Sequence, residues 1–148
     1  MDSRIKHFID SQKTASVCCI DAEGHPYCFT VFFALDAENQ LLYYKSSHNS
    51  YHGHVMEEGS KVSGTILPDK LNTLAIKGVQ FTGTVLPLED PLSKGGPVYY
   101  GKFPFAVAMP GEIWTVQLES IKFTDNSLGF SKKLHWKRGE ETVALETH

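Results

Sequence analysis

The sequence predicts a mainly β protein, a six- to seven-stranded antiparallel barrel or sandwich with two or three short helices. Short runs rich in Val, Phe and Tyr alternate with turn residues along most of the chain. No long helical segment separates these runs, which argues against a doubly wound α/β sheet. The 148 residues suffice for one domain with its own core. We expect a single barrel domain over residues 1–138 and a polar C-terminal tail over residues 139–148.

The N-terminal third predicts one helix followed by three strands. Ser3 is a suitable N-cap, and apolar residues follow at the i, i+3, i+4 spacing of a helix face: Ile5, Phe8 and Ile9. Turn signals then occur around Gly24 and again over residues 36–39. They divide the chain into strands at residues 14–21, 26–36 and 40–46, which form a meander.

The rest of the chain is less regular. Asn49 or Ser50 can cap a short helix through Glu58. Gly78 and Gly83 are bulge or corner positions in a long strand or a bent pair of strands. The further elements that we expect are strands at residues 61–67 and 71–88, an irregular helix at 91–102, a strand at 112–124 and a last strand or hairpin arm at 127–138.

Charge and cysteine usage limit the function classes. The net charge of −3 favours neither nucleic acid nor an anionic membrane as a partner. No apolar run reaches the length of a membrane span, and the charged N-terminus is unlike a signal peptide. The three cysteines, Cys18, Cys19 and Cys28, indicate neither a disulfide framework nor a zinc ribbon. We interpret Cys18 and Cys19 as small apolar residues on opposite faces of a strand and expect a cytoplasmic protein.

The first candidate site is the segment of residues 43–54, where a strand end leads into a helix start. A helix N-terminus, serine hydroxyls and a lysine together suit a phosphate group. Ordinary helix capping with solvent-facing histidines is the alternative, and the histidine spacing does not favour a metal. The residues concerned are Lys45, Ser46, Ser47, His48, Ser50, His52 and His54.

The second candidate is Gln80, an uncharged polar residue in a strand with mostly apolar neighbours. Its amide both donates and accepts hydrogen bonds, which suits the imide edge of a heterocycle. A solvent-facing strand position without a ligand is the alternative.

Several motifs resemble the flavin-binding split β-barrel of the pyridoxamine-phosphate-oxidase-like superfamily, and most closely its small bacterial YhbP-like branch. The K-G-V-Q-F-x-G run and the K-F-T-D-N-x-L-G-F run are the most specific. The resemblance covers residues 24–28, 44–47 with His52, 76–83, 102–104 and 121–130, running on to Lys132, Lys133 and Trp136.

The resemblance implies a Greek-key split barrel that forms a homodimer with flavin mononucleotide (FMN) at the interface. FAD, a deazaflavin or haem are less favoured ligands. The phosphate would lie near Ser46, Ser47, Ser50 and His52, and Gln80 would face the polar edge of the ring. Lys132 and Trp136 would reach across from the partner chain, with Lys132, or else Lys122, stabilising reduced flavin. The ring itself would lie along Phe29, Thr30, Val31 and Phe32.

One departure from the superfamily pattern concerns the phosphate. The superfamily has an Arg or Lys pair where this chain has Tyr51 and His52. Because an imidazole is only partly protonated at neutral pH, we expect weak or pH-dependent flavin binding. A flavin-dependent oxidoreductase using a small-molecule electron donor or acceptor is the leading hypothesis. A non-catalytic flavin- or haem-binding or storage module, and a dimer with an empty pocket, are the alternatives. No catalytic residue can be named.

Overall fold

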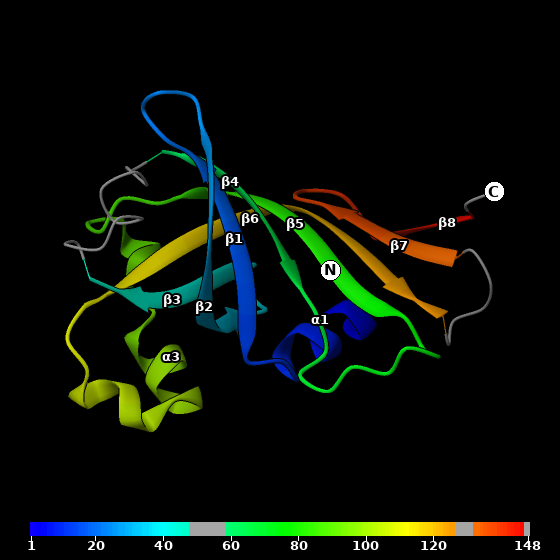
Figure 1. Ribbon diagram of the computed structural model, residues 1–148, viewed down its shortest axis with the longest axis horizontal. Helices are drawn as coiled ribbons and strands as arrows, with labels where there is room; N and C mark the ends of the chain where they lie inside the picture. The colour runs from blue at the N-terminus through cyan, green and yellow to red at the C-terminus, as the bar shows by residue number, and fades with distance from the viewer. Residues whose placement is uncertain (48–58, 127–131, 147–148) are drawn as a thin grey trace.

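The computed structural model describes residues 1–47, 59–126 and 132–146. Its strands form one antiparallel sheet in the order β3-β2-β1-β4-β5-β6-β7-β8, and β3 also pairs with β6. That pairing closes six strands into a barrel, from which β7 and β8 extend as a ribbon (Figure 1). The strands are β1 (Thr14–Ile20), β2 (Pro26–Asp36), β3 (Leu41–Ser46), β4 (Lys61–Ile66), β5 (Lys77–Val85), β6 (Glu112–Asp125), β7 (Lys132–Lys137) and β8 (Val143–Glu146).

Alternation along the strands divides the sheet into an inner apolar and an outer polar face. In β4, for example, Val62 and Ile66 are buried while Ser63 and Thr65 are exposed. This period of two is the one that a half-buried strand requires. The barrel interior holds Val17, Phe33, Leu42, Tyr44, Phe81, Val116, Ile121 and Trp136, among others. The mainly β split barrel predicted from the sequence is confirmed.

Helix α1 (Ser3–Asp10) packs its apolar stripe against the barrel. The stripe consists of Ile5, Phe8 and Ile9, all buried as the periodicity predicted. The N-cap is Asp2, whose carboxylate accepts from the backbone N–H of Arg4, so the prediction of Ser3 as the cap is wrong by one residue. The Asp2 carboxylate also forms an ion pair with the Arg4 guanidinium, an interaction that the uncharged hydroxyl of Ser3 could not provide.

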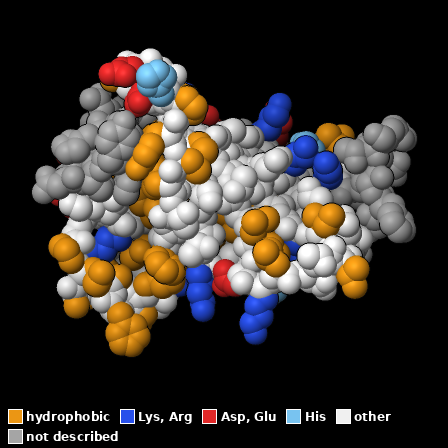
Figure 2. All heavy atoms as spheres, viewed as in Figure 1, with side chains coloured by type: hydrophobic (Ala, Val, Ile, Leu, Met, Phe, Trp, Pro, Cys, Tyr) orange, Lys and Arg blue, Asp and Glu red, His pale blue; other side chains and the backbone are white. Residues whose placement is uncertain are grey.

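A second, smaller core lies outside the barrel, where α3 (Gly96–Lys102) packs on β2 and β3. Tyr99 is its centre, and Gly95 at the helix start leaves room for the ring of Tyr43. Two short 3-10 turns flank α3, at Pro91–Ser93 (η1) and Pro104–Ala108 (η2), which agrees with the predicted irregular helix. Figure 2 shows hydrophobic side chains gathered over this region. In η2, Phe105 is 91% exposed.

Some details of these elements differ from the sequence prediction. Residues 71–76 form a loop, so the strand expected over 71–88 is limited to β5. The register shift predicted near Gly83 is present, between Thr82 and Gly83, whereas Gly78 pairs regularly with Thr124. A strand, β8, pairs with β7 in the segment for which only a polar tail was expected. The helix expected over residues 50–58 lies outside the described residues.

Candidate functional site

The outer face of the sheet carries two rows of polar side chains that run across the strands. In the first row the cross-strand partners follow one another from β2 to β7: Thr30, Ser16, Thr65, Gln80, Lys122 and His135. In the second row they are Cys28, Cys18, Ser63, Thr82, Ser120 and Lys137. Side chains that are adjacent across a sheet lie close enough to act on one ligand together.

These rows line an open groove of about 780 Å³. Its walls combine small hydroxyl residues with Gln80, Lys122 and His135. Gly64 on β4 contributes to the floor, and a Cβ there would collide with the Phe81 ring and the Ser16 carbonyl. The groove is therefore a shallow, hydroxyl-rich surface with its positive charges at the β6–β7 end.

The charges at that end affect His135. Burial, and after it the nearby Lys122, Lys133 and Lys137, lower the pKa of the His135 imidazole. A neutral imidazole keeps one ring nitrogen free as an acceptor or a metal ligand. Lys122 lies directly opposite both Gln80 and His135, on the strand between theirs. An amide, an ammonium group and a neutral imidazole thus stand side by side in the groove.

The predicted phosphate site is only partly described. Lys45 is engaged by the α3–η2 region, since its Nζ donates to the Tyr100 hydroxyl at 2.9 Å and to the Ala106 carbonyl at 2.7 Å. The Ser46 carbonyl accepts from the Trp114 indole at 3.2 Å, and Ser47 follows at the exposed end of β3. Ser50, Tyr51 and His52 lie outside the described residues, as do His48 and His54.

The four predicted ring contacts on β2 divide between the two faces of the strand. Thr30 and Phe32 point outward, whereas Val31 points into the barrel and Phe29 packs against the barrel core near Tyr44. Phe32 lies over α3, with its ring centroid 5.7 Å from that of Phe103. Among these four residues, only Thr30 belongs to the polar rows.

Of the last predicted contacts, Trp136 is 3% exposed, and its ring belongs to the barrel core. The residue also borders the groove. Lys132 begins β7, opposite Glu146, and its side chain lies outside the described part of the chain.

The end of β3 and the groove are separated along β6. Ser46 pairs with Glu112 at the start of this strand, and Gln80 pairs with Lys122 ten residues later. Ten strand residues span about 30 Å, and β6 crosses the width of the molecule in Figure 1. The two predicted halves of the ligand site therefore lie at opposite ends of β6 in one protomer.

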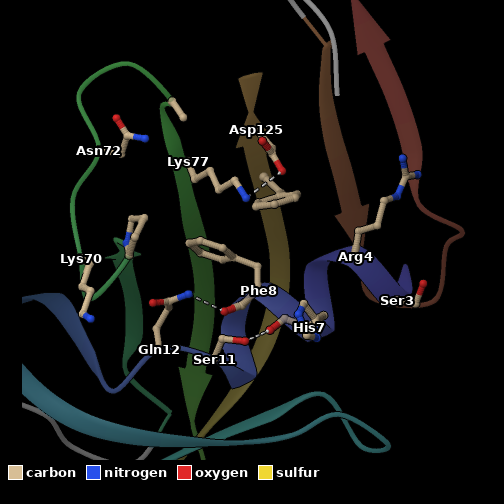
Figure 3. Close-up of a pocket in the computed structure, with 13 residues that line it drawn as sticks. Ser3, Arg4, His7, Phe8, Ser11, Gln12, Lys70, Asn72, Lys77 and Asp125 are labelled. Carbon is tan, nitrogen blue, oxygen red and sulfur yellow. Dashed lines mark hydrogen bonds and ion pairs between the residues drawn. The ribbon is translucent and has the colours of Figure 1, made fainter. Parts of the chain in front are cut away.

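A second hollow, of about 700 Å³, lies between α1 and the loop that joins β4 to β5 (Figure 3). Most of its polar side chains are engaged within the chain. Gln12 donates to the Phe8 carbonyl at 3.0 Å and accepts from the Asp69 N–H at 2.8 Å. Lys77 pairs with Asp125 at 3.7 Å. The Gln12 bonds join the end of α1 to the loop, and the Lys77–Asp125 pair joins β5 to β6.

Sequence reasoning missed His135 altogether and named Lys122 only as a reserve. The sequence contains a signal for both residues, because the alternation along each strand places Lys122 and His135 at outward-facing positions. The pairing of β5, β6 and β7 was needed to place them beside Gln80. Within the described ranges, no three His, Cys, Asp or Glu side chains gather as metal ligands, and no helix is long and apolar enough to cross a membrane.

Comparisons with known proteins identify the family and the fold. The sequence profile of the pyridoxamine 5′-phosphate oxidase family matches residues 1–104. Proteins called UPF0306 protein YhbP, from Salmonella schwarzengrund and Salmonella paratyphi A, are each 37% identical over 121 residues. The match covers 81% of this chain and 82% of theirs.

Solved structures share the fold at low identity. A pyridoxamine 5′-phosphate oxidase-related, FMN-binding protein from Nostoc punctiforme has a TM-score of 0.67 at 10% identity, with 98% of this chain and 95% of that chain covered. A haem-binding protein from Mycobacterium smegmatis has a TM-score of 0.70 at 15% identity. The match covers 88% of this chain but 55% of that one, so this chain spans about half of its length. HutZ, a haem storage protein from Vibrio cholerae, has a TM-score of 0.56 at 19% identity. The match covers 79% of this chain and 87% of that chain.

Proposed function

Because the chain belongs to the pyridoxamine 5′-phosphate oxidase family, and within it groups with the UPF0306 YhbP proteins, we propose that it is a homodimeric FMN-binding protein and a flavin-dependent oxidoreductase. One observation carries the proposal. Gln80 and Lys122 are cross-strand partners on the wall of an open, hydroxyl-rich groove.

Gln80 and Lys122 suit the polar edge of a flavin ring. The Gln80 amide donates one hydrogen bond and accepts another, which matches the alternating carbonyl and N–H groups of the imide. The Lys122 ammonium group next to it stabilises negative charge that develops on this edge when the ring is reduced. When bound, the flavin supplies the hydride chemistry, and the protein supplies position and charge. Lys132, the other candidate for this role, has a side chain outside the described part of the chain.

The phosphate would bind at the end of β3, through the hydroxyls of Ser46 and Ser47. Since Ser46 and the Gln80–Lys122 pair lie about 30 Å apart along β6, a single FMN does not reach both within one protomer. A homodimer with two-fold symmetry removes the difficulty, because the β3 end of one protomer can complete the groove of the other. The separation is thus a physical reason to expect a dimer with its cofactor at the interface.

Titration with FMN tests the binding proposal. We expect quenching of flavin fluorescence by the wild type, and an affinity about tenfold lower in Lys122→Met, which loses a charge-assisted bond. Lys70→Met removes a lysine from the other hollow and serves as the matched control. Absence of quenching at millimolar FMN would rule out flavin as the ligand.

Two further measurements separate the remaining parts of the proposal. Sedimentation of the purified protein with and without FMN gives the oligomeric state, and a monomer in both conditions would contradict the shared site. Reduction of bound flavin by NADH or NADPH, followed by reoxidation with an added acceptor, tests the oxidoreductase activity. A flavin that binds but never turns over would leave a storage or carrier role.

Haem is the second candidate, and His135 favours it. Its imidazole lines the groove, and its lowered pKa keeps it neutral, as an axial iron ligand must be. A haem titration should then give a shifted Soret band that His135→Ala alters. If the Soret band of free haem does not move, or if His135→Ala leaves the shifted band unchanged, His135 is not the ligand.

A further inference from the structure

Cys18 and Cys28 lie directly opposite one another on the hairpin that β1 and β2 form. The backbone bonds of the hairpin identify the kind of pair. The Phe33 N–H donates to the Lys13 carbonyl, and the Asp21 N–H donates to the His25 carbonyl. Residues 13 and 21 therefore belong to hydrogen-bonded pairs. Because such pairs recur at every second residue of an antiparallel ladder, the odd-numbered residues of β1 belong to hydrogen-bonded pairs and the even-numbered residues do not. Cys18 and Cys28 therefore form a non-hydrogen-bonded pair.

This position brings the two side chains close enough for a covalent bond. In antiparallel sheets the Cα atoms of a non-hydrogen-bonded pair lie about 4.5 Å apart, closer than in the hydrogen-bonded pairs. A disulfide requires Cα atoms roughly 4.4–6.8 Å apart. The register thus meets the distance requirement without any displacement of the strands. A hydrogen bond with the Cys28 thiol is also the main reason that the pKa of Cys18 is raised.

Both thiols are accessible from the same side. Cys28 is exposed and Cys18 partly exposed, and both contribute to the wall of the outer-face groove. Cys19, the neighbour of Cys18 in sequence, points the other way and is 2% exposed inside the barrel. The molecule therefore contains one accessible thiol pair and one enclosed thiol that serves as an internal control.

We propose that Cys18 and Cys28 form a reversible cross-strand dithiol–disulfide couple on the wall of the groove, oxidised by low-molecular-weight disulfides such as oxidised glutathione. The Cys28 thiolate attacks one sulfur of the reagent, forming a mixed disulfide and releasing one glutathione thiol. The Cys18 thiolate then attacks the Cys28 sulfur and displaces the second. Two protein thiols and one glutathione disulfide become one protein disulfide and two glutathione thiols.

The raised pKa of Cys18 determines the kinetics that we expect. Only the thiolate is nucleophilic, and its fraction rises tenfold per pH unit below the thiol pKa. The second step should therefore accelerate with pH. Oxidation also removes two S–H groups from the groove wall, next to Ser63 and Ser16.

The test uses the full-length protein without added cofactor, so that it is independent of flavin binding. Reduced protein is incubated with oxidised glutathione, quenched in acid, alkylated and analysed by peptide mass spectrometry without reduction. We expect one intramolecular disulfide joining Cys18 to Cys28, a mass lower by about 2 Da, and full reversal by dithiothreitol. The wild type alone answers the question, so the test does not depend on any variant folding.

Two variants sharpen the result. Cys19→Ala should still form the disulfide, because the enclosed thiol takes no part. Cys18→Ser should stop at a stable glutathione adduct on Cys28. The proposal is overturned if the wild type itself stops at that adduct, if Cys18 joins to Cys19, or if Cys28 crosslinks two chains.

Discussion

The two hollows of this molecule are similar in size but differ in how their polar groups are used. Around the hollow between α1 and the β4–β5 loop, Gln12 and Lys77 are bonded to other groups of the same chain (Figure 3), and Arg4 pairs with Asp2. On the wall of the outer-face groove, Gln80, Lys122 and His135 have no hydrogen bond or ion pair with another side chain in the described part of the protein. Polar groups already satisfied by the chain maintain the fold, whereas groups left to solvent are available to a ligand.

The largest effect that we expect is on stability, at the α1 hollow. Phe8→Ala removes a ring that is 7% exposed and lies 5.1 Å from the ring of Phe123. The free energy of unfolding should fall by about 3–4 kcal/mol, measured by urea denaturation. His7→Ala, on the exposed side of the same helix, should change it by less than about 0.5 kcal/mol. Equal losses in the two variants would mean that the hollow is not part of the core.

A smaller loss should follow from Gln12→Ala. Its amide is buried and bridges the Phe8 carbonyl and the Asp69 N–H. Removing it leaves both partners without that bond, at a cost of about 1–2 kcal/mol in unfolding free energy. Ser11→Ala loses an exposed bond to the His7 carbonyl and is the matched control, for which we expect a much smaller loss. A Gln12→Ala protein as stable as the wild type would remove the distinction between the two hollows.

In the outer-face groove we expect a substitution to change ligand binding and to leave the stability of the fold unchanged. Gln80→Ala should leave the free energy of unfolding within about 0.5 kcal/mol of the wild type, because the residue is exposed. The same variant should weaken FMN binding by about tenfold, since the ring would lose its hydrogen-bond partner. Denaturation and fluorescence titration of one preparation measure both quantities. Lower stability with unchanged affinity would identify Gln80 as structural.

The smallest effect concerns the pH dependence of His135. Its pKa is lowered in the folded protein, so the unfolded chain takes up a proton at a higher pH than the folded chain does. The contribution of neutral His135 to the stability of the fold is therefore fully present above the pKa of the unfolded state. It is lost as the pH falls from that value through the lower pKa of the folded state. Between about pH 7.5 and pH 5.5 the melting temperature should fall more for the wild type than for His135→Gln. A fall of equal size in both proteins would show that His135 does not contribute.

Sequence patterns predicted the strands of the barrel better than they predicted the site. The alternation in β2 and β4 and the turns at Gly24 and Asp36 are local signals, and the strands that they indicate are present. β8 was missed because residues 143–146 are short and largely exposed, with no buried face to give a pattern. The loop at 71–76 was included in a strand because its leucines and isoleucine suggest burial, yet Leu74 is 93% exposed.

The residues of the chain fixed the barrel, its apolar interior and the family, because periodicity and motif are properties of neighbouring positions. Only the tertiary structure decided which residues meet across strands. Lys122 and His135 join Gln80, and Cys18 joins Cys28, through cross-strand register. Ser46 and Gln80, which were expected at one ligand, are held apart by the length of β6. Register depends on pairing between distant segments, and a shift of one residue would turn each of these side chains to the other face.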